Sequence, residues 1–202
     1  MQARRLHWPS LLRQAVFPLH LLAAAAAAHA APDAQAGDAE PGAITQADIP
    51  ANAPRFERFP AVGRFTGRIA EPDVQSHPRS RNFRTVIRQG AKQGPNFAGH
   101  YTIVDWWWGA GRKAYAVVDA NTGQVFHPQE LQSVGDLEHV ESSPDRDGDP
   151  LDFRIDSRLV VAMGAVNFDS TKRGISWLVW EGTRFRRVLF VAKPPPDTIP
   201  RR

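Results

Sequence analysis

The sequence predicts an α+β domain that is mainly β: an antiparallel meander of about three hairpins, with one N-terminal helix packed on a face of the sheet. Three observations support this fold class. One segment has apolar residues at helical spacing, and three later segments have a strand, a turn and a second strand. These segments lie within about 140 residues, the usual size of one domain with a single core.

Residues 80–91, "SRNFRTVIRQGA", form the predicted helix. Ser80 is a suitable N-cap, because its hydroxyl can accept a hydrogen bond from a free backbone N–H of the first turn. Gly90 and the "GPN" at 94–96 end the helix. Its apolar face consists of Phe83, Val86, Ile87 and Ala91, and its basic face of Arg81, Arg84 and Arg88.

The rest of the domain has the pattern of β-strands. Residues 100–107, "HYTIVDWW", are β-branched and aromatic, which favours a strand. Hairpins follow at 114–127, 151–168 and 174–193, because Asn, Asp, Ser and Gly residues at the centre of each segment favour tight turns. A helix on one face of such a sheet would leave the other face to form the rest of the core.

Both ends of the chain are predicted to lie outside the domain. Residues 1–30 have a basic start, an apolar middle and the small-residue exit "AHA", which predict a secretory signal peptide cut after Ala30. The apolar run is shorter than the roughly 20 residues of a membrane span, so we expect no membrane anchor. Residues 31–54 are predicted to be a flexible leader, 55–193 the globular domain and 194–202 a proline-rich tail.

Charge and cysteine content exclude several classes of function. The chain has a formal charge of +4, and the three basic residues of the signal segment account for most of it. An excess of one positive charge in the processed chain does not favour nucleic-acid binding. The chain has no cysteine, so a thiol nucleophile, a thiolate metal site and a disulfide framework are all excluded.

The segment "DWWWGAG" at 105–111 is the main candidate for a binding site. Alternate residues of a strand share a face, so a regular strand cannot shelter Trp106, Trp107 and Trp108 on one side of the sheet. Exposed indoles would form a contact surface for a sugar ring or a protein side chain, with Asp105 and Arg112 as polar neighbours. The alternative is that the indoles pack in the core, against Phe83, Trp177 and Trp180.

Four blocks of sequence resemble a family of small exported bacterial proteins. They are "GPNFAGHYTIVDW", "AVVDANTGQVF", "FRIDSRLVVAMG" and "WEGTRFRRV", within residues 80–190. The resemblance implies a β-rich exported domain and carries no activity. Where the family pattern has two cysteines around the glycine-rich corner, this chain has Trp108 and Arg112, and Trp107 stands in place of a glycine. The resemblance therefore implies a corner that has been altered here.

Two other groups of residues are candidates for chemistry. Asp145, Asp147 and Asp149 have the spacing of calcium ligands, although Pro150 stands where a calcium loop needs glycine; the alternative is a solvated acidic turn. A hydrolase would use His100 with Asp105 or Asp119, the two acids facing each other across the first hairpin; the alternative is that both are solvated acids at the hairpin ends.

The sequence favours a binding protein over an enzyme. We expect a periplasmic or secreted, non-enzymatic module that contacts an envelope protein or glycan, in the manner of an inhibitor or immunity protein, and that needs no cofactor. The Trp corner would make the contact, and the basic face formed by Arg81, Arg84 and Arg88 would either add to it or be only solvated surface. The alternative function is a small carboxylate- and histidine-dependent hydrolase. The oligomeric state is left open.

Overall fold

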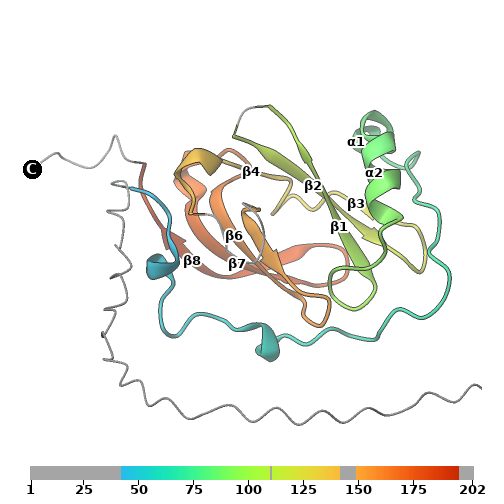
Figure 1. The fold of residues 1–202 in the computed structure, drawn as a ribbon, viewed down its shortest axis with the longest axis horizontal. Helices are drawn as coiled ribbons and strands as arrows, with labels where there is room; N and C mark the ends of the chain where they lie inside the picture. The colour runs from blue at the N-terminus through green and yellow to red at the C-terminus, as the bar shows by residue number, and fades with distance from the viewer. Residues whose placement is uncertain (1–41, 110, 142–148, 196–202) are drawn as a thin grey trace, which may run out of the picture. The chain divides into compact units, whose positions relative to one another are not determined.

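The computed structural model describes residues 42–109, 111–141 and 149–195 (Figure 1), all of which belong to one compact unit. The predicted class is confirmed: the fold is α+β, mainly β, with one antiparallel sheet and a short helix packed against its first strand. No helix among the described residues has the length and hydropathy needed to cross a bilayer.

The sheet contains eight strands. Its order is β1-β2-β4-β6-β7-β8, with β3 paired to β2 and β5 paired to β6. The strands are β1 Tyr101–Trp107, β2 Lys113–Asp119, β3 Val125–Phe126, β4 Ser133–Gly135, β5 Leu151–Phe153, β6 Leu159–Val166, β7 Arg173–Trp180 and β8 Phe185–Ala192. Within the described residues, four short 3-10 helices occupy Gln46–Asp48, Phe56–Arg58, Leu137–His139 and Ser170–Lys172.

The three predicted hairpins are present as β2–β3, β5–β6 and β7–β8. A further hairpin, β1–β2, joins the Trp segment to the sheet. The short strand β4 was not predicted, and it bridges β2 to β6, so that the early and late hairpins form one sheet.

The predicted single helix is interrupted. It consists of α1, Pro78–Asn82, and α2, Arg84–Ala91, separated at Phe83, whose ψ of 23° is not helical. Ser80 is not the N-cap: the first helix starts one turn earlier because Nδ1 of His77 accepts the backbone N–H of Arg79 at 3.1 Å. Ser80 is instead buried, with its hydroxyl 2.8 Å from Nε2 of His127.

Helix α2 covers one face of β1 and β2, beside which both helices lie in Figure 1. Ile87 and Ala91 pack with Val104 and Trp106 in this layer of the core. The approach is close at Gly90, where an added Cβ would lie 2.5 Å from a methyl carbon of Val104. Glycine therefore lets the helix sit directly on the strand, although it is a weak helix former.

The opposite face of β1 and β2 joins the aromatic core. Phe97, Ile103, Tyr115 and Trp180 are buried together there. Strand β7 alternates between two layers, so that Leu178 and Trp180 enter this core while Trp177 and Val179 face the other side of the sheet.

Residues 42–54 do not all behave as the predicted flexible leader, because part of this segment covers the second face of β6 and β7. Ile44 is fully buried in the cluster that contains Trp177. Its N–H donates to the carbonyl of His139 and its carbonyl accepts from Glu141, each at 2.8 Å. The ordered structure thus begins before residue 55, since these contacts with residues about 95 positions away give the segment a place to pack.

The outer edge of β1 is partly closed by a side chain. Oδ1 of Asn96 accepts the N–H of Ile103 at 2.8 Å, and Nδ2 of Asn96 donates to the carbonyl of Ile103 at 3.1 Å. The carboxamide therefore takes the place of a neighbouring strand at this position.

Candidate functional site: the tryptophan corner

Two of the three consecutive tryptophans are exposed. Trp106 is 8% exposed, whereas Trp107 and Trp108 are 63% and 49% exposed. Trp106 packs in the layer that contains α2. Trp107 lies on the opposite face of β1 and is not part of the aromatic core on that face. The prediction that this segment cannot shelter all three indoles is confirmed.

Trp107 belongs to a group of four neighbouring residues on one face of the β1–β2 hairpin. The register pairs Trp107 with Lys113 and Asp105 with Tyr115. Cross-strand partners share a face, as do residues two apart on one strand, so all four lie together. We call Asp105, Trp107, Lys113 and Tyr115 the Trp107 block.

The Lys113 ammonium is the centre of this block. Its Nζ lies 3.0 Å from Oδ2 of Asp105 and 3.2 Å from Oδ2 of Asp149, and 5.3 Å from the centre of the Trp107 ring. Burial lowers the pKa of Lys113, but the hydrogen bond to Asp105 and the negative charges of both carboxylates outweigh burial and raise it. Lys113 is therefore a permanent cation that holds two acids beside the exposed indole.

The Tyr115 hydroxyl adds a buried polar group. Tyr115 is 2% exposed, and its hydroxyl has no hydrogen-bond partner among the described residues. Burial raises the pKa of Tyr115 well above its usual value, and the charges of Asp149 and Asp105 raise it further. The phenol thus remains protonated and keeps an unused donor near the two carboxylates.

Trp108 has different neighbours. Its ring lies 6.3 Å from Phe83 and 6.1 Å from Phe168, and the Arg79 guanidinium lies 5.5 Å from its centre. Two hydrogen bonds to Gln132, of 2.8 and 2.9 Å, hold Arg79 in place. Trp108 is therefore supported by aromatic and cationic groups while half of its surface remains exposed.

The other residues predicted for the corner have separate partners. Arg112 lies over the Phe168 ring at 4.7 Å, so it flanks the Trp108 side. Asp105 pairs with Lys113 and flanks the Trp107 side. Of the three packing partners in the alternative prediction, Phe83 contacts Trp106 and Trp108. Trp177 and Trp180 belong to two other parts of the core.

The predicted basic face is exposed but loosely organised. Arg81 donates to the carbonyl of Gln75 at 2.7 Å, Arg84 donates to the carbonyl of Arg81 at 3.2 Å, and Arg88 pairs with Glu71 at 3.0 Å. None of these contacts connects the arginines to the indoles within the described part of the chain. Exposed pairs of this kind contribute little free energy.

The three residues of the alternative hydrolase do not come together at one place. The β1–β2 register places Asp105 and Asp119 at opposite ends of the hairpin, so the expectation that they face each other is wrong. His100 comes within 4.0 Å of Asp119, whose carboxylate already accepts from Asn121 at 2.8 Å and Thr122 at 3.0 Å. Asp119 thus stabilises the turn that follows β2.

The predicted calcium loop is only partly described. Asp145 and Asp147 lie outside the described residues. Asp149 accepts the backbone N–H of Leu151 through Oδ1 at 3.0 Å and pairs with Lys113 through Oδ2. Both of its oxygens therefore have protein partners. Asp149 also lines a cavity of about 710 Å³ between residues 46–57 and the Trp177 face of the sheet, which thus adjoins the Trp107 block.

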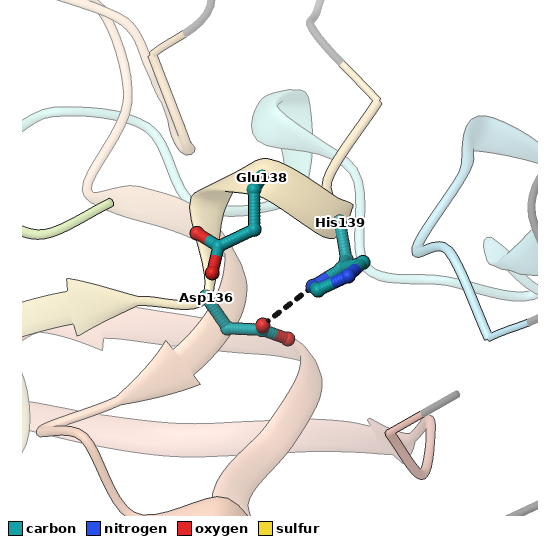
Figure 2. A group of neighbouring side chains, drawn as sticks. All are labelled: Asp136, Glu138 and His139. Atoms are coloured by element: carbon teal, nitrogen blue, oxygen red, sulfur yellow. Dashed lines mark hydrogen bonds and ion pairs between the residues drawn. The ribbon is translucent and has the colours of Figure 1, made fainter. Parts of the chain in front are cut away.

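A second charged cluster, which the sequence did not reveal, lies at the 3-10 helix Leu137–His139. Figure 2 shows Asp136, Glu138 and His139 together, with Nδ1 of His139 donating to Oδ1 of Asp136 at 2.8 Å. Their ligand atoms lie within 4.8 Å of one another, a spacing compatible with a metal ion. However, Asp136 also pairs with the buried guanidinium of Arg173, so its charge is already neutralised. The cluster acts as an ion-pair network.

This network makes stability depend on pH. The hydrogen bond to Asp136 raises the pKa of His139 above 6.5, so the folded state binds the His139 proton more tightly than the unfolded state. The resulting stabilisation is complete below about pH 6.5 and is lost as pH rises through the folded pKa. Burial lowers the pKa of His127 to about 4, which makes stability rise with pH over the same range, so His139 is tested by difference. We expect the urea midpoint of the wild type to exceed that of His139→Gln by more at about pH 5.5 than at about pH 8.5. A difference that does not change with pH would contradict this role.

Comparisons with protein families, curated proteins and solved structures find no match for this chain. The candidate site is therefore defined by its own geometry.

Proposed function

We propose that this chain is an exported, non-enzymatic binding module that contacts an envelope glycan through the tryptophan corner, Trp107 and Trp108. The observation that carries the proposal is the exposure of two adjacent indoles, each held by a cation and flanked by polar groups. Contiguous exposed apolar surface marks interaction sites, and tryptophan is enriched among the residues that contribute most to binding.

A glycan fits the Trp107 side better than a protein anchor does. A sugar ring has an apolar face that packs on a flat indole, and hydroxyl groups at its rim that donate to carboxylates. Trp107 presents such a ring, with Asp105 at its side. An inhibitor-like role against an envelope enzyme would use the same surface.

The exported location rests on the sequence. The signal peptide predicted at residues 1–30 lies outside the described residues, and the resemblance to exported bacterial proteins supports the same location. The absence of cysteine fits a domain whose stability comes from its buried core, without disulfide bonds.

Co-sedimentation with purified peptidoglycan sacculi tests the proposal. The wild-type domain is expected to bind, and Trp107→Ala is expected to weaken binding by about tenfold or more, because a tryptophan at the centre of a contact contributes about 2 kcal/mol. Trp107→Phe keeps a flat ring and should retain part of the affinity.

Val62→Ala is the matched control, since Val62 is also a large apolar side chain that is 71% exposed. It should bind like the wild type. Equal sedimentation of wild type and Trp107→Ala, or no sedimentation of either, would overturn the proposal.

A further inference from the structure

The group formed by Asp105, Asp149 and Lys113 beside Trp107 carries a net negative charge. Two carboxylates, Asp105 and Asp149, are held by one ammonium, Lys113. One negative charge is left without a partner in this group. Lys113 is mostly buried, with its side chain 12% exposed, whereas the Asp105 side chain is 42% exposed. The uncompensated charge therefore faces solvent at Asp105.

One carboxylate oxygen of the group is free to accept a ligand hydrogen. Lys113 occupies Oδ2 of both acids, and Leu151 occupies Oδ1 of Asp149. Oδ1 of Asp105 has no partner among the contacts of the described residues. It lies on the same face of β1 as the Trp107 ring, two residues away.

Tyr115, the cross-strand partner of Asp105, does not occupy that acceptor. Its hydroxyl is buried and has no hydrogen-bond partner in the described part of the chain. Oδ1 of Asp105 is therefore left to a donor from outside the protein.

We propose that the Trp107 block selects an amino sugar with a free, protonated amine over its N-acetylated counterpart. The apolar face of the sugar ring packs on Trp107, and the ammonium donates to Oδ1 of Asp105. This inference rests on the proposed function and names the substrate class of the same site. Acetylation removes the positive charge and thereby the attraction to Asp105.

The test compares two ligands of equal length: the trimer of glucosamine and the trimer of N-acetylglucosamine. Tryptophan fluorescence follows each titration at a pH at which the amine is protonated. The wild type is expected to bind the glucosamine trimer about fivefold more tightly, the upper range for an exposed ion pair. The preference should shrink as salt is added, because ions screen exposed charges.

Asp105→Asn is the decisive variant, because it keeps the size and an acceptor oxygen but removes the charge. It should lose the preference for the free amine, so that its affinities for the two trimers become equal. Thermal melting of the variant checks that it is folded. Glu57→Asn, which removes an exposed acid outside the Trp107 block, should keep the preference.

The outcomes separate this inference from the proposed function. Equal affinity of the wild type for the two trimers overturns the charge preference and leaves glycan binding intact. Binding of neither trimer, together with no binding to sacculi, overturns both. If trilysine displaced the glucosamine trimer as strongly as the unlabelled trimer itself does, the site would recognise the positive charge and not the sugar. That result would overturn the assignment to a sugar.

Discussion

Trp180→Ala is expected to lower the free energy of unfolding by about 3–5 kcal/mol, the cost of removing a large buried aromatic side chain. Trp180 is 1% exposed, and its ring centre lies 4.9 Å from Phe185, 5.4 Å from Tyr101 and 5.6 Å from Phe126. These rings come from β1, β3 and β8, so the cavity would loosen several strands at once. Urea denaturation measures the loss.

Val62→Ala serves as the control for this measurement, because it removes an exposed apolar side chain from a loop. Its effect should stay within about 0.5 kcal/mol. A loss of less than about 1 kcal/mol for Trp180→Ala would show that the ring is not enclosed as the structure has it.

Arg173→Met is expected to cost about 3 kcal/mol, since it removes one partner of a buried ionic network. The Arg173 side chain is 2% exposed and pairs with Asp136. Its guanidinium also donates to the carbonyls of Gly42 at 2.9 Å, Lys193 at 2.7 Å and Pro194 at 3.1 Å. A single side chain thus ties both ends of the described chain to β7.

The measurement for Arg173→Met is again urea denaturation, with limited proteolysis as a second readout. Cleavage within residues 42–54 should become faster, because that segment loses its bond at Gly42. Arg88→Met is the matched control: its exposed pair with Glu71 contributes at most about 1 kcal/mol. Equal losses in the two variants would contradict the role of Arg173.

Local sequence signals predicted most of the sheet. The hairpins β2–β3, β5–β6 and β7–β8 were found because each combines a residue pattern typical of strands with a turn whose residues tolerate tight geometry. The turn at Gly123 is an example: this glycine has a φ of 77°, and an added Cβ would lie 2.2 Å from the carbonyl oxygen of Glu71.

Contacts between segments far apart in the sequence could not be predicted from local residue patterns. Residues 31–54 contain two large apolar residues, Ile44 and Ile49, which are too few to form a pattern. Ile44 enters the core because it pairs with Val140 from a distant part of the chain. The strand β4 has three residues, too few for a pattern of alternation. The break in the helix at Phe83 was not predicted, because the helical spacing of apolar residues continues through it.

The sequence predicted the exposed indoles of the candidate site but not the Lys113 ammonium beside them. Alternation along β1 was enough to show that the indoles could not all be buried, because it depends on sequence alone. The role of Lys113 depends on the register of β1 against β2 and on Asp149, which comes from another loop. Likewise, Arg173 lies 37 residues from Asp136, so no spacing rule connects them.

The Asn96 carboxamide also affects whether the sheet of one molecule can pair with the sheet of another. A strand at the rim of a sheet offers unpaired amides and carbonyls to any extended chain, which is how β proteins begin to form aggregates and fibrils. At Ile103 both groups are already satisfied from within the molecule. A strand from another molecule would have to displace the Asn96 carboxamide before it could pair with β1. Asn96 therefore disfavours self-association at the middle of the free edge of β1.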